Sequence, residues 1–445
     1  MRAMKDSGIE WIGEIPQEWE IKQIKYALEI HGGGAWGANK GESEQDRICV
    51  RVADFDYSHL CVIFSDAMTI RSYTQKTIHD STLKNGDILI EKSGGGETTP
   101  VGRSVLFSSE REMMCANFIE WLRPNASVNS LFLNYWFSAA YNNGNSKRNI
   151  KQTTGIQNLD ITAFLSEKVA IPSVEEQQKI SQFLEARCAE IDALIAAKEK
   201  TNALLKERRQ SIIYEAVTKG LDPTVPMKDS GVEWIGEIPE GWKVHPLRSK
   251  YSFSKGLSIT KADLAGEGVC VISYGQIHSK DNIGISVRDS LIRYLPTNHE
   301  SLTETAKANV GDLIFADTSE DLQGCGNCVY VDREDIYAGY HTLILRPKDV
   351  GIGRFCAYLF AADAWRAQVR SKVSGVKLFS ITQDILKRTA LLEPPIEERV
   401  SIVKFLDAKC AEIDALIAAN VYSVEKLKEY RQSLIYEAVT GKIEV

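Results

Sequence analysis

The sequence lacks the short motifs that identify most catalytic sites. It contains no G-x-x-x-x-G-K-[ST] loop for nucleotide phosphates, no G-x-S-x-G nucleophile turn and no H-E-x-x-H zinc motif. Adenine methyltransferases carry an [N/D]-P-P-[Y/F] loop. Glu393-Pro394-Pro395-Ile396 lacks both the amide or acid and the aromatic ring of that loop. These absences argue against a P-loop ATP site and against a self-sufficient methyltransferase or nuclease.

The sequence also has no long apolar run. No segment resembles a transmembrane span, and the charged start MRAMKDSGIEW has no apolar signal-peptide core. The nine cysteines are scattered, and Cys325 and Cys328 form one CxxC pair without a second pair or a histidine cluster. We therefore expect a cytoplasmic chain with reduced thiols, no bound metal and no membrane partner.

An excess of positive charge is missing as well. The formal net charge is −7, which argues mildly against a free-standing nucleic-acid binder because such proteins are usually basic. Phosphate contacts, however, need only local basic patches. The 445 residues exceed the size of one ordinary hydrophobic core, so at least two domains are expected.

What the sequence does contain is a long internal duplication. Thirteen of the eighteen residues in Met4–Ile21 recur in Met227–Val244, and the helical segment Cys188–Thr218 recurs as Cys410–Thr440. Between these blocks the similarity is weaker but keeps its order: NGDILIEKSGGG corresponds to VGDLIFADTSED, and CANFIEWLRP corresponds to AGYHTLILRP. Two long copies indicate a duplicated unit rather than a solenoid.

Each copy ends in a long predicted helix. Ser173 is expected to cap the first helix, with Glu176 completing a capping box, and Gly220 follows its end. Apolar residues recur at three- and four-residue steps in both helices, which predicts a packed stripe on each. We expect the two stripes to pack on each other in an antiparallel pair, and the alternative is that each helix packs on its own domain. The stripe residues are Ile180, Phe183, Leu184, Ile191, Leu194, Ile195, Ile402, Phe405, Leu406, Ile413, Leu416 and Ile417.

The segments between the repeated blocks have a different pattern. Short β-rich runs such as RICVRVADF, GDILIEKS and DLIFADT are separated by Gly, Asn, Asp and Ser, and shorter helical pieces follow them. This predicts α+β domains with a mixed or antiparallel sheet. LDPTVP, residues 221–226, contains two prolines and is predicted to link the halves.

Local charge points to candidate nucleic-acid contacts. A basic stretch without acids occurs at matching places in both halves, and cations and amides suit phosphates and base edges. A glycine loop after the GDILIE strand is a second candidate, because glycine lets the backbone approach a phosphate. Any one of these segments alone is more readily a solvated loop, but their matched placement favours binding. The candidates are Lys92, Ser93, Gly94, Gly95, Lys147, Arg148, Asn149, Lys151, Gln152, Thr153, Arg366, Arg370, Lys372 and Lys377.

A further glycine-rich motif is GGGAWG, from Gly32 to Gly37. It fits the G-x-G-x-x-G dinucleotide fingerprint by letter. That fingerprint must open a helix, and the following ANKGESEQDR is a poor helix former. We do not expect a dinucleotide site here.

The repeated blocks resemble the specificity subunit of type I restriction-modification enzymes. The resemblance rests on DSGIEWIGEIPQEWE and DSGVEWIGEIPEGWK, on the GDIL and GDLI strands, and on IPSVEEQQKISQFLEARCAEIDALI with its second copy PPIEERVSIVKFLDAKCAEIDALI. It covers essentially the whole chain. It implies target recognition domains at residues 1–172 and 227–394, and conserved helices at residues 173–220 and 395–445. The two helices are expected to form an antiparallel spacer with a pseudo-two-fold repeat.

The resemblance also implies partners and chemistry. Each recognition domain would read one half of a bipartite, asymmetric site in double-stranded DNA. The helices would dock two methyltransferase subunits, and endonuclease/translocase subunits would join the complex. This chain would be non-catalytic and bind no cofactor, whereas the partners would use S-adenosylmethionine, ATP and Mg. The second loop departs from the first, because Glu320 and Asp321 are poor phosphate partners.

Two other functional classes remain open at this point. A stand-alone, two-domain DNA-binding regulator would explain the basic segments without partner subunits. A coiled-coil scaffold would explain the helices but leave the basic segments unexplained.

Overall fold

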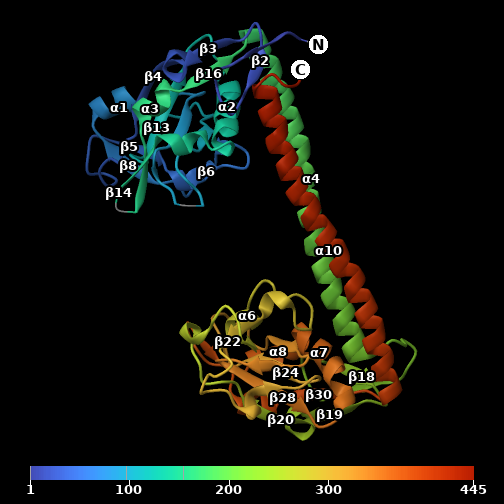
Figure 1. The fold of residues 1–445 in the computed structure, drawn as a ribbon. Helices are drawn as coiled ribbons and strands as arrows, with labels where there is room; N and C mark the ends of the chain where they lie inside the picture. The colour runs from blue at the N-terminus through green and yellow to red at the C-terminus, as the bar shows by residue number, and fades with distance from the viewer. Residues whose placement is uncertain (1, 97, 154) are drawn as a thin grey trace. The chain divides into compact units, whose positions relative to one another are not determined.

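The computed structural model describes residues 2–96, 98–153 and 155–445, apart from the side chains of Thr153 and Val350. The chain divides into two compact units. One is Met1–Ala197 with Ser423–Val445, and the other is Lys198–Tyr422. Each unit combines a sheet-rich domain with parts of two long helices (Figure 1).

The domain of the first unit has a mixed sheet system. Its largest sheet has the order β4-β13-β9-β11-β7-β6, formed by Leu28–Gly33, Ile119–Pro124, Ile88–Glu91, Ser104–Leu106, Cys61–Val62 and Phe55–Asp56. A second sheet, β12-β5-β8, comprises Met113–Cys115, Gln45–Val50 and Ile70–Tyr73, and its β12–β5 pair is parallel. The smaller pairings are β1-β2 (Met4–Asp6, Glu14–Pro16), β3-β16 (Glu20–Gln23, Lys168–Ile171) and β10-β15-β14 (Ser93–Gly94, Ile156–Leu159, Ile150–Thr153). The short helices are α1 (Gln75–Ser81), α2 (Ser130–Asn142) and α3 (Ile161–Ser166).

The domain of the second unit repeats this plan. Its larger sheets are β20-β28-β24-β26 (Tyr251–Lys255, Thr342–Pro347, Leu313–Ala316, Cys328–Tyr330) and β22-β21-β27-β23 (Arg293–Leu295, Val269–Ile272, Ile336–Ala338, Lys307–Ala308). The smaller pairings are β17-β18 (Met227–Asp229, Glu237–Pro239), β19-β30 (Lys243–Pro246, Ala390–Glu393) and β25-β29 (Thr318–Ser319, Phe379–Ser380). The short helices are α5 (Leu247–Lys250), α6 (Tyr274–Ile277), α7 (Gly353–Ala361), α8 (Asp363–Arg370) and α9 (Gln383–Lys387).

The repeated GD and LRP motifs have a structural explanation in this plan. Asp87 in the first GD is almost completely buried, and its carboxylate lies 2.8 Å from the Arg123 guanidinium. In the second unit the buried Asp312 carboxylate lies 2.8 Å from the Arg346 guanidinium. A buried carboxylate is costly unless a cation pairs with it, so both motifs must be kept together.

Two long helices complete the fold, α4 (Val174–Lys219) and α10 (Ile396–Val439). In the first unit, Asp192 of α4 lies 3.4 Å from Arg431 of α10. In the second unit, Arg209 of α4 lies 3.2 Å from Asp414 of α10. Residue numbers that rise on one helix and fall on the other indicate antiparallel helices, which confirms the expected fold class.

The start of α4 only partly follows the expected capping box. The Ser173 hydroxyl accepts a hydrogen bond of 3.3 Å from the Glu176 N–H, as expected for an N-cap. The Glu176 carboxylate instead accepts two hydrogen bonds from the Arg2 guanidinium, at 2.5 and 2.9 Å. Gly220, which follows α4, has a φ of +76°, the left-handed geometry that ends many helices.

The helix stripes pack in both ways that the sequence left open: on the other long helix and on a domain. In each unit, buried residues of α4 and α10 join one core with the side chains of the domain. Leu194 and Leu416 depart from the expectation, because they are 52% and 50% exposed, and Phe405 is 37% exposed. Leu194 precedes Ile195 by one residue, or about 100° of helix rotation, which turns it away from the packed side. Ile180, Leu184, Ile191, Ile402, Leu406 and Ile413 are buried, and Phe183, Ile195 and Ile417 are half-buried.

The repeated opening phrase packs against a helix end in each unit. In the first unit the Tyr436 hydroxyl of α10 donates a hydrogen bond of 3.2 Å to the Trp11 carbonyl. In the second unit the Trp242 indole donates one of 2.9 Å to the Glu398 carboxylate. Trp11 and Trp19 also pack against α2, on Trp136 and Phe132 respectively.

Trp234, the counterpart of Trp11 in the second unit, is 41% exposed. The packing of Trp19 on Phe132 matches that of Trp242 on Phe355, which aligns α2 with α7. By that alignment Leu359 takes the place of Trp136. Trp234 therefore lacks the aromatic partner that covers Trp11.

Candidate nucleic-acid interface

The ends of several strands meet on one face of the first unit. The strand register pairs Gly33 with Glu120, Glu91 with Ile119, and Val50 with Cys115. The loops that follow or precede these residues therefore lie together. We call this surface the loop face of the first unit; it consists of Gly34–Trp36, Arg51, Lys92–Gly95, Ala116–Phe118 and the β14–β15 hairpin.

The second unit builds an equivalent surface with the same backbone hydrogen bonds. The Lys92 N–H donates to the Phe118 carbonyl at 2.9 Å, and the Asp317 N–H donates to the His341 carbonyl at 3.1 Å. Likewise, the Gly34 N–H donates to the Ile119 carbonyl at 2.9 Å, and the Gly256 N–H donates to the Thr342 carbonyl at 3.0 Å. The loop face of the second unit consists of Gly256–Ser258, Ser273–Tyr274, Asp317–Ser319, Gly339–His341 and residues 374–380.

The structure brings together the two kinds of candidate segment that the sequence indicated. In the first unit β10, which contains Ser93 and Gly94, pairs with β15 of the basic hairpin. In the second unit β25 pairs with β29, which follows the basic stretch. The Leu159 N–H bonds to the Lys92 carbonyl at 2.8 Å, and the Ile381 N–H to the Asp317 carbonyl at 2.7 Å. Segments 60 residues apart in sequence therefore form one surface in each unit.

The residues of the first glycine loop are largely engaged within the protein. The Lys92 ammonium lies 2.9 Å from the buried Glu120 carboxylate, which also contacts His31 at 2.9 Å. The Ser93 hydroxyl donates to the Asn158 side chain at 2.7 Å. Gly94 and Gly95 have φ values of +125° and +44°, and a Cβ on Gly95 would meet Val101 at 2.9 Å. The glycines are thus required by the turn itself.

The basic stretch of the first unit combines an exposed lysine with several paired groups. Lys147 is exposed and has no ion-pair partner among the described residues. The Arg148 guanidinium lies 2.5 Å from the Glu10 carboxylate, and this hydrogen bond raises the pKa of Arg148. Asn149 is buried and its amide donates to Glu167 at 3.2 Å. Of these three, only Lys147 is fully available to a ligand.

The hairpin that follows carries the remaining candidates of this unit. The Lys151 ammonium lies 2.5 Å from the Asp160 carboxylate, and its hydrogen bond holds the pKa of that carboxyl below the usual value. Gln152 is exposed and pairs across the hairpin with Gln157. Thr153 belongs to β14, but its side chain lies outside the described part of the structure.

In the second unit the two arginines have structural roles. Arg366 donates to the Asn327 side chain at 2.6 Å and to the Phe360 carbonyl at 3.0 Å. Arg370 pairs with Asp363 at 2.7 Å and donates to the Gln323 carbonyl at 3.1 Å. Both guanidinium groups hold the loop after β25 against α8. Lys372 and Lys377 are exposed and, in the described part of the chain, form no ion pair.

The sequence patterns did not predict several side chains that are exposed on the loop faces. Trp36 and Phe118 are exposed on the first loop face, at 40% and 52%. Tyr340 and His341 follow β27 on the second, and His341 has a φ of +54°. The signal that could have indicated them is an aromatic residue inside a glycine-rich or polar loop, where no core requires it.

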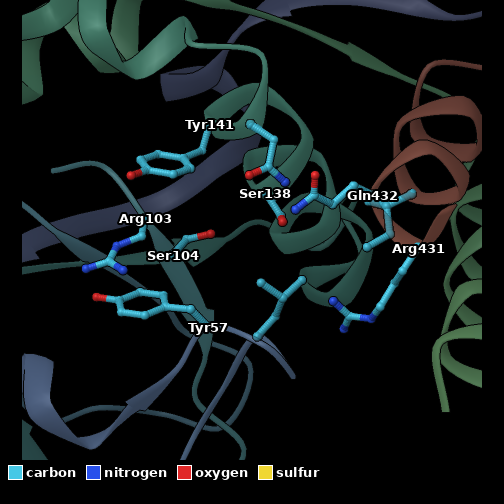
Figure 2. Close-up of a pocket in the computed structure, with 10 residues that line it drawn as sticks. Tyr57, Arg103, Ser104, Ser138, Tyr141, Arg431 and Gln432 are labelled. Atoms are coloured by element: carbon cyan, nitrogen blue, oxygen red, sulfur yellow. The ribbon is translucent and has the colours of Figure 1, made fainter. Parts of the chain in front are cut away.

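A small cavity of the first unit lies away from the loop face (Figure 2). Arg103 lies over the Tyr57 ring at 3.6 Å and pairs with the buried Glu91 at 3.0 Å. Tyr141 lies on the other side of Arg103 in this view, and Arg431 and Gln432 of α10 close the cavity. Its volume of about 100 Å³ is small beside ligand pockets of roughly 300–1,000 Å³. This is polar packing between a domain and a helix.

The described residues contain neither a candidate metal site nor a membrane-spanning helix. No group of three or more His, Cys, Asp or Glu side chains in residues 2–96, 98–153 and 155–445 is arranged to hold a metal ion. Within the same residues, no helix is long and apolar enough to span a membrane.

Comparison with known proteins gives matches over most of the chain. Residues 16–206 match the protein family described as the type I restriction modification DNA specificity domain. The chain is 21% identical to the type I restriction enzyme MjaVIII specificity subunit of Methanocaldococcus jannaschii. That alignment covers 97% of this chain and 94% of the relative.

Two solved structures share the fold. One chain comes from work on complex assembly and conformational transition of the type I R-M system. It aligns with a TM-score of 0.69 and 14% identity, over 96% of this chain and 99% of that one. The HsdS subunit from Thermoanaerobacter tengcongensis aligns with a TM-score of 0.51 and 15% identity, over 96% and 98% of the two chains.

Proposed function

We propose that this chain, which belongs to the specificity subunits of type I restriction-modification enzymes, reads the two halves of a bipartite, asymmetric DNA site. A specificity subunit is a non-catalytic component that recognises DNA. The observation that carries the proposal is the pair of loop faces. They share a backbone framework and expose different side chains, as two readers of different base sequences would.

Charge supports DNA as the ligand despite the acidic chain. Three exposed cations form no ion pair in the described part of the protein: Lys147 beside the first loop face, Lys372 beside the second and Lys377 on the second. Such groups can neutralise phosphates locally, whatever the net charge. Partner subunits would supply further phosphate contacts.

We propose that the helices dock two methyltransferase subunits, joined by endonuclease/translocase subunits. The repeated helix sequence would offer the same surface twice. Exposed apolar residues at equivalent places support this: Leu194 and Leu416 are 52% and 50% exposed, and Val174 and Ile396 are 50% and 68% exposed. The partners would use S-adenosylmethionine, ATP and Mg, and this chain would bind none of them.

We further propose that α4 and α10 set the number of base pairs between the half-sites. α4 runs without interruption from the first unit into the second, and α10 from the second into the first. Four residues inserted in the middle of both helices add about one turn, or 5.4 Å. The spacer should then lengthen while both half-sites stay the same.

Methylome sequencing of cells that express the chain with its methyltransferase partner tests the function and the spacer together. The expected result is one bipartite, asymmetric motif, and a longer spacer for the insertion variant. Altered half-sites with a constant spacer would contradict the spacer role. Full affinity and specificity of the purified chain without any partner would instead favour a stand-alone DNA-binding regulator.

A further inference from the structure

The first loop face carries an aromatic hollow that none of the basic candidates explains. Trp36 and Phe118 line a cavity of about 460 Å³ together with Arg51, Ala116 and Asn117. Trp36 is 40% exposed and Phe118 is 52% exposed. Large aromatic side chains that stay exposed around a hollow of this size indicate a binding surface.

The protein holds Trp36 firmly although its ring faces solvent. The Ala35 N–H donates to the Cys115 carbonyl at 2.8 Å, and the Tyr73 hydroxyl donates to the Ala35 carbonyl at 3.1 Å. The Arg71 guanidinium donates to the Trp36 carbonyl at 3.1 Å and lies 4.6 Å from the Trp36 ring. An ordered contact surface loses less conformational entropy on binding.

This arrangement also accounts for the GGGAWG motif. No helix follows it, so it does not open a dinucleotide site. A Cβ on Gly34 would collide with the Ala116 carbonyl oxygen, and one on Gly37 would meet the Ser72 carbonyl oxygen at 2.8 Å. Gly37 also has a φ of +69°, which favours glycine. The glycines let the chain pass close to β8 and β12 and present Trp36.

The groups around the hollow suit an A·T base pair. Among the described residues, the exposed Asn117 amide has no side-chain hydrogen bond, and an Asn amide pairs with adenine N6 and N7. The aromatic rings offer apolar contact, which suits the C5-methyl group of thymine. Arg71, which forms no ion pair among the described residues, places positive charge beside the Trp36 ring, which complements a phosphate backbone. Arg51, which lines the hollow, is paired with Asp54 at 3.5 Å.

We infer that Trp36 and Phe118 contact the methyl group of a thymine in the half-site read by the first unit, and that Asn117 reads the adenine of that pair. The inference rests on the proposed DNA-reading function and assigns it a specific base contact. The second loop face has Ser258, Tyr340 and His341 at the equivalent places, so this contact belongs to one half-site only.

Deoxyuridine substitution tests the contact, because it removes the thymine methyl group and nothing else. The complex of the full chain with its methyltransferase partner is titrated with duplexes that carry the motif found by methylome sequencing. Each thymine of the first half-site is replaced in turn. One replacement should weaken binding about four-fold, the value of one buried methyl group. With Phe118→Ala or Trp36→Ala, that replacement should have no further effect.

Matched controls separate this contact from general damage. Tyr26→Ala removes a 63% exposed aromatic ring next to β4 at the end opposite Trp36, and should keep the deoxyuridine effect. Asn117→Ala should remove sensitivity to 7-deazaadenine at the partner adenine. Circular dichroism and unchanged recognition of the second half-site would show that the variants fold.

Other outcomes overturn the inference without touching the proposed function. A first half-site without an A·T pair would exclude it, as would equal binding of all deoxyuridine duplexes. If Trp36→Ala weakens binding while deoxyuridine has no effect, the ring stacks on a base instead of reading a methyl group, and the inference is wrong. Absence of any sequence-specific binding by the wild-type complex would count against the proposed function itself.

Discussion

The loop faces of the two units share their backbone hydrogen bonds but differ in the side chains that they expose. The hydrogen bond from the Lys92 N–H to the Phe118 carbonyl is matched by the one from the Asp317 N–H to the His341 carbonyl. Yet Lys92 stands where the second unit has Asp317. The first face offers aromatic rings and arginines, whereas the second offers histidine, tyrosine and carboxylates.

Under the proposed function, this difference would let one framework read two sequences. Backbone hydrogen bonds do not depend on side-chain identity, so the loops keep their positions while their exposed residues vary. The residues that must not vary are those that hold the framework, such as the buried Asp–Arg pairs and the close-approach glycines. Substitutions of framework residues and of exposed loop residues therefore test whether stability and DNA recognition depend on different residues.

The largest expected effect comes from breaking the buried ion pairs. Asp87→Ala leaves Arg123, whose side chain is 16% exposed, without its carboxylate. We expect a loss of about 3–5 kcal/mol in the free energy of unfolding of the first unit. Asp312→Ala should cost the second unit less, because Arg346 is 41% exposed and can turn to water. Hydrogen exchange of amides in β9 and β24 measures each unit separately.

The control for this pair is Asp66→Ala, which removes an exposed carboxylate. It should change stability by no more than about 0.5 kcal/mol. Equal losses for Asp87→Ala and Asp312→Ala would mean that arginine exposure does not govern the cost. The comparison of the two frameworks would then need another explanation.

A smaller effect is expected from the close-approach glycines. Gly34→Ala would push a methyl group against the Cys115 carbonyl oxygen at 2.5 Å, and Gly256→Ala would do so against that of Ala338 at 2.9 Å. Displacing either loop should cost about 1–3 kcal/mol. Competition binding with half-site mutants should show that each variant weakens recognition of one half-site and spares the other.

Gly266→Ala is the matched control, since its added methyl group meets no atom within 4 Å. It should leave both half-sites unchanged. Loss of both half-sites from a single loop substitution would refute independent reading by the two units.

The fold was largely predictable because the repeats and the helix stripes are long patterns. The apolar period identified α4 and α10, and capping residues also marked α4. The order of the GD and LRP motifs matched the two sheet systems. Single positions on the helices were less secure, as Leu194 and Leu416 show. A stripe drawn from three- and four-residue steps admits neighbours that the helix turns towards solvent.

The candidate site was predictable only as a set of segments. Matched basic stretches and the glycine loop do meet through β10–β15 and β25–β29 pairing. Sequence could not show that Lys92 and Arg366 are engaged by partners far along the chain, Glu120 and Asn327 respectively. The exposure of Trp36 and Phe118 could not be predicted either, because it depends on strand ends that meet only in the folded domain.

The smallest expected effect distinguishes free cations from paired ones on these faces. Lys147→Ala and Lys377→Ala each remove an exposed ammonium group that has no ion pair among the described residues. If each contacts one phosphate, the slope of log K against log salt concentration should fall by about 0.9, with both half-sites still read. Salt titrations of DNA binding by the assembled complex measure this slope.

Lys92→Ala provides the opposite case within the same surface. Its ammonium pairs with Glu120, whose side chain is 7% exposed, so its loss leaves a buried carboxylate that still contacts the His31 ring at 2.9 Å. The expected result is lower stability of the first unit with an unchanged salt slope, because a cation held by a buried acid releases no counterion from DNA. A salt slope that falls for Lys92→Ala and stays constant for Lys147→Ala would reverse the assignment of these two lysines.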